Sequence, residues 1–330
     1  MKSSAWLIRL IGLALFVLVL TRIDLGHSLV LLKRAAPATL AGAALLIFPM
    51  MAVKTVRWQW LQRSAGLKET PFGRSYLAYF TGMFAGLVTP GRVGELVRVR
   101  YLTGQGAALG PALSSVVWDR IFDVAGLLLV GVVALWPLAD EFRALYLATL
   151  AGLGLLVVAA FLLVVRSRNR VSVAGPISEK MKESPSRMTS VPGWSVVVRV
   201  RDLAPDLLRS VSRLDLATLT GVVLLTLAGW VVYYLQAWLL ARTLGIGLGL
   251  LPLIVAITAA AVAAFLPVSI SGLGTRDAAL VVLFQRFGRP PEEAVALSTL
   301  IFLILAVNAV LGFVASQILS LRFREVGIKS

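Results

Sequence analysis

The segment of residues 83–95 reads MFAGLVTPGRVGE: an apolar stretch, a break at Pro90-Gly91, and charged side chains directly after the break. Residues 265–277 read FLPVSISGLGTRD and repeat this order of features. Unwound backbone is tolerated at membrane depth only where it is buried in protein or lines a cavity. Paired broken segments in the two halves of a membrane protein therefore point to a transporter's binding site.

The composition of the chain places it in a membrane. Hydrophobic residues make up 58% of the sequence, and the apolar runs reach the length that a helix needs to cross a bilayer. The net charge of +16 lies mainly between these runs, where basic residues set topology and meet anionic lipid head groups. No nucleic-acid-binding module accompanies the charge, so we expect no nucleic-acid partner. The absence of cysteine excludes disulfides and thiol chemistry.

The apolar runs predict two kinds of element, helices that cross the membrane and re-entrant hairpins that enter it and return to the same side. The predicted spans are residues 6–20, 38–53, 121–138, 145–165, 216–240 and 296–319. Residues 76–102 and 250–287 each contain an apolar segment, a break and a second segment. Because residues 76–88 would form only about 20 Å of helix, they are too short for a hydrocarbon core of about 30 Å. The sequence therefore predicts an all-α integral membrane protein with about six transmembrane helices and two re-entrant helical hairpins.

The distribution of Lys and Arg predicts the orientation of these elements. Residues 54–74 and 166–215 and the C-terminal tail are rich in basic residues, so we assign them and both termini to the cytoplasm. The first hairpin then enters from the cytoplasm and the second from outside, which makes the two halves an inverted repeat. We divide the chain into a first membrane half (1–165), a basic cytoplasmic linker (166–215) and a second membrane half (216–330). Five tryptophans near span ends are predicted to lie at the interface: Trp6, Trp58, Trp60, Trp136 and Trp238.

Three charged residues follow the first break at intervals of three. On a helix, Arg92, Glu95 and Arg98 share one side, so Glu95 can pair with either arginine. Such groups near the core cost about 2.5–3.5 kcal/mol each on insertion scales unless they are paired or hydrated, so we expect a polar cavity. In our interpretation Arg92 and Arg98 bind an anionic head group, above all a phosphate, whose oxygens match the guanidinium fork. The alternative is a cytoplasmic loop whose charges reach the membrane surface.

A second charged group stands at the start of the apolar run 121–138. Asp119 and Asp123 are one helical turn apart, with Arg120 beside them. They are placed to pair with the arginines after the first break, or to carry a coupling proton. Alternatively, Asp119 caps the helix and Arg120 anchors it at the cytoplasmic surface, which leaves Asp123 unexplained.

The second break carries the same features with fewer charges. Gly272 and Gly274 permit a tight turn of backbone amides, and Ser269 offers a hydroxyl to an anion. Arg276 and Asp277 follow directly and need not contact each other. We predict one substrate site from both breaks, with the candidates Arg92, Glu95, Arg98, Asp119, Arg120, Asp123, Ser269, Gly272, Gly274, Arg276 and Asp277.

Motifs of known enzyme classes are missing from the sequence. No hydrolase, nucleotide-binding or metal-enzyme pattern occurs with supporting context, and the single histidine, His27, lies in a short loop. We therefore expect no enzymatic activity, no catalytic residue, no cofactor and no metal.

These motifs together resemble the flippase-like family that shares the membrane region of lysylphosphatidylglycerol synthases. The resemblance lies in residues 89–95 with Arg98, in Asp119-Arg120 with Asp123, and in residues 267–269 and 272–277. It covers nearly the whole chain and implies a bacterial or archaeal inner-membrane protein that moves a lipid between leaflets, with these residues near the path. Ser271 and Asp277 depart from the usual Pro or Gly and from the usual Glu. Because the sequence carries no soluble aminoacyl-transferase domain, the resemblance does not imply lipid lysinylation.

The function that the sequence favours is a lipid flippase for phospholipids or polyprenyl-phosphate-linked sugars. Paired hairpin tips would bind the head group by alternating access while the acyl chains stay in lipid. One alternative is a non-transporting scaffold for a glycosyltransferase or another lipid- or glycan-synthesis enzyme, with internally paired charges and no cavity. Another is a membrane enzyme that acts on lipid phosphates with Glu95 or Asp123 as its base. Neither carboxylate has a nucleophile or a metal cluster near it in the sequence. The flippase predicts that Arg92 and Arg276 face one cavity.

Overall fold

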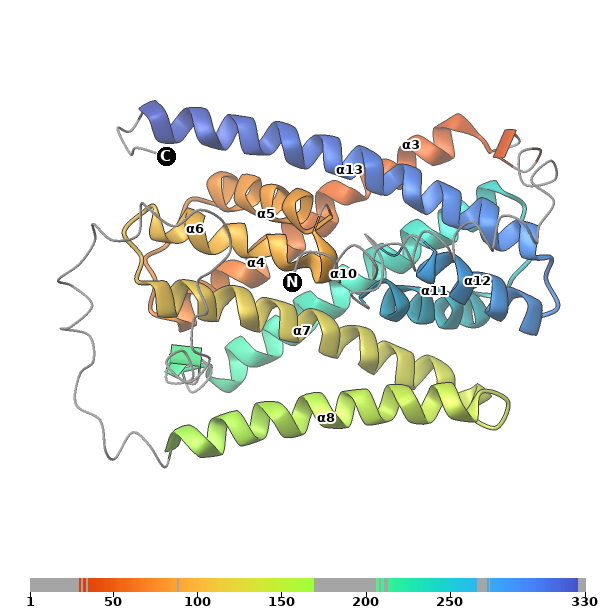
Figure 1. Cartoon of the computed structure of the whole chain (residues 1–330), viewed down its shortest axis with the longest axis horizontal. Coiled ribbons are helices and arrows are strands. Elements are labelled where there is room, and N and C mark those ends of the chain that lie inside the picture. Colours follow the sequence, from red (N-terminus) through yellow and green to blue (C-terminus); the bar gives the residue numbers. More distant parts are fainter. Residues whose placement is uncertain are drawn as a thin grey trace, which may run out of the picture.

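The computed structural model describes residues 30, 32–33, 35–87, 89–168, 206–207, 209–210, 213–265, 272 and 274–325, and within them it contains helices and no strand (Figure 1). The first half contains α3 (Pro37–Leu45), α4 (Ile47–Ser64), α5 (Phe72–Leu87), the 3₁₀ helix η1 (Pro90–Leu96), α6 (Val97–Thr103), α7 (Leu109–Leu135), the 3₁₀ turn η2 (Trp136–Leu138) and α8 (Arg143–Arg168). The second contains α10 (Leu216–Thr243), α11 (Leu250–Phe265), α12 (Thr275–Arg286) and α13 (Pro291–Glu325).

Four stretches of the described chain are long and apolar enough to cross a membrane. They are Pro37–Ser64, Leu109–Leu138, Leu216–Thr243 and Pro291–Ser320, and shorter apolar helices cover Arg143–Ala159 and Leu250–Ala264. Large apolar side chains such as Leu155 and Leu224 point outward, as expected for helix faces in lipid. The chain is a multi-pass membrane protein. The predicted span 6–20 and most of the linker 166–215 lie outside the described residues.

Two predicted spans have different ends in the structure. The run 38–53 continues through α4 to Ser64, so Lys54 and Arg57 belong to a helix and not to a cytoplasmic loop. The run 121–138 belongs to a helix that begins at Leu109, which rules out Asp119 as its cap. Hydropathy alone ended the first span too early and began the second too late, because charged side chains continue both helices and are paired inside the protein.

Each predicted break separates two helical segments that pack against each other. After α5 ends at Leu87, the chain continues through η1 into α6, and both contact α5. After α11 ends at Phe265, α12 begins beyond Gly274, whose φ of 84° lies in the left-handed region that glycine adopts without strain. α12 then packs on α11. The helix–break–helix prediction is confirmed in both halves.

The two hairpins start at opposite ends of the helix bundle (Figure 1). The end of α4 meets the beginning of α10, because Arg63 and Thr218 line the same groove, and α5 follows α4 at that end. The turn after α7 meets the end of α12, where the rings of Phe142 and Phe287 lie 5.3 Å apart. α10 runs from the end of the bundle where α5 begins to the end that holds the turn after α7. α11 follows α10 and therefore starts at this second end. The second hairpin is therefore inverted relative to the first.

Each hairpin also packs against the long helix of the other half. α5 packs along α13, α11 packs along α7, and α4 contacts α10 between them. Glycines permit this approach: a Cβ at Gly312 of α13 would lie 2.6 Å from the Phe80 carbonyl oxygen, and one at Gly131 of α7 would lie 3.0 Å from Thr258 of α11. This reciprocal pattern is the one that two copies of a repeat around a pseudo-two-fold axis produce.

Replacing Gly312 by Ala is expected to lower the free energy of unfolding by about 1–3 kcal/mol, because the new methyl group must displace the backbone of α5. The matched control is Gly154→Ala on α8, where nothing lies within 4 Å of the new Cβ. Thermal unfolding in detergent compares the two variants. If Gly312→Ala were as stable as Gly154→Ala, α5 and α13 would not approach as closely as described.

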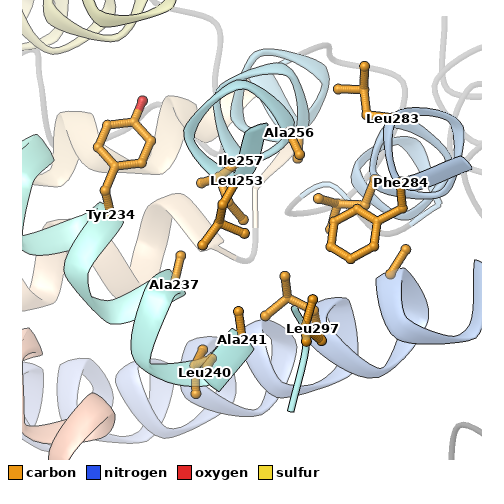
Figure 2. Close-up of a cluster of buried hydrophobic side chains, with 14 of the residues drawn as sticks. Tyr234, Ala237, Leu240, Ala241, Leu253, Ala256, Ile257, Leu283, Phe284 and Leu297 are labelled. Atoms are coloured by element: carbon orange, nitrogen blue, oxygen red, sulfur yellow. The ribbon is translucent and has the colours of Figure 1, made fainter. Parts of the chain in front are cut away.

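The apolar core of the second half lies between α10, α11, α12 and α13 (Figure 2). Ile257, Leu280 and Phe284 are at most 1% exposed and pack against small and apolar residues of α10 and α13. Burying a large apolar side chain contributes about 1.5–3 kcal/mol, which in this protein holds α12 firmly in place. The position of Arg276 in the first turn of α12 is fixed by this packing.

Candidate functional site

α4 and α7 face each other with complementary charges. Lys54 Nζ lies 2.8 Å from Asp123 Oδ1, and Arg57 Nη2 lies 2.7 Å from Asp119 Oδ1. Spacings of three on α4 and four on α7 place each set of charges on one helix face. The ion pairs therefore join the two helices inside the bundle, away from lipid.

Asp119 is the centre of this network. Its Oδ1 accepts hydrogen bonds from Arg57 Nε at 2.9 Å and Nη2 at 2.7 Å. Its Oδ2 accepts from Arg98 Nη1 at 2.8 Å and from the Tyr79 hydroxyl at 2.9 Å. A fully buried carboxylate needs such partners, because its desolvation is otherwise uncompensated. Asp119 thus ties α7 to α4, α5 and α6 at once.

Arg98 is fully buried among aromatic rings. Its guanidinium carbon lies 4.3 Å from the ring centre of Tyr79 and 5.0 Å from that of Trp58, which adds cation–π attraction to its ion pairs. The predicted pairing with Glu95 is confirmed, with 3.3 Å between Nη2 and Oε2. Trp58, which we predicted at the interface, is instead completely buried, because the charged face of α4 turns it inward.

Glu95 connects the first hairpin to α7. Its Oε1 lies 2.8 Å from Arg120 Nη1 and 4.0 Å from Arg92 Nη1. Gly86 makes room for this side chain, since a Cβ there would lie 2.6 Å from Glu95 Cγ. Three arginines therefore surround one carboxylate at the tip of the hairpin.

The tip itself is shaped by Thr89, Gly94 and Arg92. The Thr89 hydroxyl donates to the Ala85 carbonyl oxygen at 2.8 Å and accepts from the Gly94 N–H at 2.7 Å. A side chain at Gly94 would collide with the backbone of Ala85. Arg92 has a φ of 57°, which is uncommon for a residue with a Cβ. Such strained residues cluster at functional sites.

Arg276 occupies the corresponding place in the second hairpin. Its Nε donates to Ser298 Oγ at 3.0 Å, and its Nη2 lies 3.5 Å from Asp277 Oδ1, so the two neighbours do contact each other. Asp277 also accepts from the Ser298 hydroxyl and, at 2.7 Å, from the Gly274 N–H. Because Asp277 uses this N–H, Gly274 shapes the turn without offering its amide to an anion.

A cavity of about 130 Å³ lies where the two hairpin tips meet. Arg92 and Glu95 line it from the first half, and Arg276 lines it from the second. Tyr233 of α10 also lines it. Apolar side chains of α4, α5, α11 and α13 complete the wall. Arg92 and Arg276 therefore line the same cavity.

The charge around this cavity is positive. The first-half cluster contains five cations (Lys54, Arg57, Arg92, Arg98 and Arg120) and three carboxylates (Glu95, Asp119 and Asp123), all joined by ion pairs. Arg276 and Asp277 add one charge of each sign. Cations exceed carboxylates by two at membrane depth, where unbalanced charge is costly. An anion in the cavity would reduce this imbalance.

The predicted site residues fall into three groups. Those that line the cavity are Arg92, Glu95, Arg120, Asp123 and Arg276. Those that are buried behind the wall and hold it are Arg98, Asp119 and Asp277. Gly272 and Gly274 form the second turn with φ of 82° and 84°, and Ser269 lies outside the described residues.

Lys54 and Arg57 were not predicted as site residues, because we counted them as loop charges. A signal for them was present, because two carboxylates at helical spacing in an apolar run require cations, and Lys54 and Arg57 have a matching spacing. We also did not predict Tyr233 and Asn308, single polar residues within long apolar runs that line the cavity. No feature of their immediate sequence separates them from surrounding lipid-facing or core positions.

The carboxylates of the site are bonded to arginines and lysine and are not arranged around a metal position. No group of three or more His, Asp or Glu that could hold a metal ion occurs within the described ranges. The cations that line the cavity are Lys54, Arg92, Arg120 and Arg276.

Comparison with known proteins gives a family match. The family model described as lysylphosphatidylglycerol synthase TM region matches residues 6–312. No curated protein matches the chain significantly.

Proposed function

Since this chain belongs to the lysylphosphatidylglycerol synthase TM region family, whose membrane domain is related to lipid modification or transport, we propose that it is a lipid flippase. Its substrate is a lipid with an anionic, phosphate-containing head group, either a phospholipid or a polyprenyl-phosphate-linked sugar. It works in the inner membrane of the cell, with both termini in the cytoplasm.

The observation that carries this proposal is the cavity between the hairpin tips. Arg92 and Arg276 come from opposite halves of the chain and line the same space, in which positive charge is in excess. Guanidinium groups present paired N–H donors that match phosphate oxygens. At about 130 Å³ the cavity is well below the roughly 300–1,000 Å³ of sites that enclose a drug-sized ligand. It fits a head group, while the acyl chains remain in lipid.

The arrangement of the hairpins supports alternating access. Each tip ends near the middle of the bundle, and the hairpins start at opposite ends, so we propose that both are re-entrant. Movement of one hairpin against the long helix of the other half would open the cavity to one side and then to the other. The head group would stay bound to the arginines at the tips.

Catalysis is not part of this proposal. Glu95 and Asp123, the two carboxylates that line the cavity, are each held by cations at 2.8 Å. A general base needs a lone pair free to take a proton from the substrate. We therefore propose transport without chemical change.

A scaffold for a lipid- or glycan-synthesis enzyme is the second candidate. The observation in its favour is the internal pairing of the charges, such as Arg57 with Asp119 and Arg98 with Asp119. The cavity and its excess of cations favour the flippase, because a scaffold needs neither.

Reconstitution in vesicles tests the proposal. Wild-type protein is expected to move a head-group-labelled phosphatidylglycerol between leaflets, and Arg276→Gln is expected to lose most of this transport. The matched control is Arg286→Gln, an exposed position on the same helix. Wild-type vesicles that move no more lipid than protein-free vesicles would favour the scaffold. Normal transport by Arg276→Gln would show that the shared cavity is not the path.

The orientation of the chain is tested by cysteine labelling, because the protein contains no cysteine of its own. We expect a cysteine at position 74 to react only from the cytoplasm and cysteines at positions 140 and 292 only from outside. These positions lie at opposite ends of the bundle, where the two hairpins start. Labelling of positions 140 and 292 from the cytoplasmic side alone would reverse the assignment.

A further inference from the structure

Asn308 lines the cavity from α13, and the oxygen of its side-chain amide is buried without a hydrogen-bond partner in the described part of the chain. It is 5% exposed, and its Oδ1 has no hydrogen-bond partner among the described residues. Buried polar atoms in folded proteins are almost always bonded, so such an exception calls for a physical reason. Burial of a bare amide oxygen in an apolar helix is unfavourable, and a bound ligand would relieve it.

The neighbouring polar groups of the cavity do not satisfy this oxygen. Gln236 of α10 also lines the cavity, but its Nε2 donates to the Ala43 carbonyl oxygen at 2.6 Å. The Arg120 guanidinium, which also lines the cavity, binds Glu95 and the Tyr79 hydroxyl. The residues next to Asn308 on the same wall, Ile304 and Leu305, are apolar.

The chemistry of an amide oxygen excludes the phosphate as its partner. Asn Oδ1 accepts hydrogen bonds, and an ionised phosphodiester carries acceptor oxygens and no proton to donate. In the proposed function, the phosphate is bound by the arginines of the hairpin tips, Arg92 and Arg276. The acceptor on α13, Asn308 Oδ1, would therefore bind a different part of the same head group, one that carries an O–H or N–H.

We infer that Asn308 selects head groups that carry a hydrogen-bond donor, a hydroxyl or an amine, beyond the phosphate. This inference rests on the proposed function and deepens it by naming a feature of the substrate. Glycerol and sugar head groups qualify, whereas a phosphate esterified with a simple alkyl group does not. The excess of cations selects the negative charge, and Asn308 selects the donor.

Two lipids of equal charge separate these effects. Phosphatidylglycerol and phosphatidylethanol are both single phosphodiester anions, and only the first carries head-group hydroxyls. With an acyl-chain fluorophore on each, vesicles containing wild-type protein are expected to move phosphatidylglycerol about two- to tenfold faster, the range that one net hydrogen bond supports. Asn308→Leu keeps the side-chain size, so it is expected to slow phosphatidylglycerol to the rate of phosphatidylethanol and leave phosphatidylethanol unchanged.

Each other outcome overturns the inference in a recognisable way. Equal transport rates for the two lipids in the wild type would show that the protein does not recognise a hydrogen-bond donor on the head group. A preference that persists in Asn308→Leu would assign the selection to another group, and equal slowing of both lipids would make Asn308 structural. If the wild type moves neither lipid while remaining folded, the proposed function fails as well.

Discussion

Asp119→Ala is expected to cause the largest loss of stability of any single substitution in this site, about 3–5 kcal/mol. The change leaves Arg57 and Arg98, both fully buried, without the carboxylate that binds each of them at 2.7–2.8 Å. Each arginine keeps only its longer ion pair, Arg57 with Asp123 at 3.2 Å and Arg98 with Glu95 at 3.3 Å. Breaking a buried ion pair by removing one partner costs far more than the complete pair contributes. Thermal unfolding in detergent should show a lowered midpoint.

The control for this variant is Asp140→Ala, in the exposed turn after α7. It removes the same charge without breaking a buried pair, and we expect its unfolding midpoint to match the wild type. A small shift for Asp119→Ala, comparable with that of Asp140→Ala, would mean that water or other groups compensate the arginines. The buried network would then contribute little to the fold.

Arg92→Lys is expected to lose most lipid transport, and Arg92→Ala to lose more. Lysine keeps the charge but cannot present two parallel N–H donors to a phosphate. A hydrogen bond to a charged group contributes about 1.5–3 kcal/mol, which corresponds to about a 10- to 100-fold lower rate if it is made in the transition state. Reconstituted vesicles with head-group-labelled phosphatidylglycerol measure the rates.

The matched control is Arg100→Lys, on the same hairpin but exposed. Both Arg92 variants should remain folded, because the side chain of Arg92 is about one-third exposed and lies at 4.0 Å from its ion-pair partner Glu95. Wild-type rates in Arg92→Lys would show that charge alone is sufficient at this position. The same loss in Arg100→Lys would trace the effect to the hairpin surface.

The fold could be predicted from the sequence where local rules act alone. Pro90-Gly91 and the glycines at 272 and 274 lie where helices end, so both helix–break–helix segments were placed correctly. The ends of α4 and α7 were not, because charged residues such as Arg57 and Asp119 continue a helix when a partner from another helix neutralises them. A hydropathy scale scores each charged residue by itself, whereas its ion-pair partner lies on a different helix, distant in the sequence.

The candidate site shows the same division. The pairing of Glu95 with Arg98 follows from their spacing and is confirmed. Whether a charged residue lines the cavity or lies behind its wall depends on how the helix is rotated about its axis. The spacing of residues in the sequence does not determine this rotation. Arg92 and Arg98 look equivalent in sequence, yet Arg92 lines the cavity and Arg98 is buried under Trp58.

The exchange of packing partners between the halves has a consequence for biosynthesis. α5 needs α13 as its neighbour, and α13 begins only at Pro291, so the first hairpin is made long before its final support. Contacts between segments so distant in sequence form slowly, because a large loop must close first. The first hairpin must therefore wait for this support until the segment from Pro291 onward has been made. The first hairpin is therefore completed only after α13 has been inserted, and the face of α5 that α13 covers depends on other contacts until then.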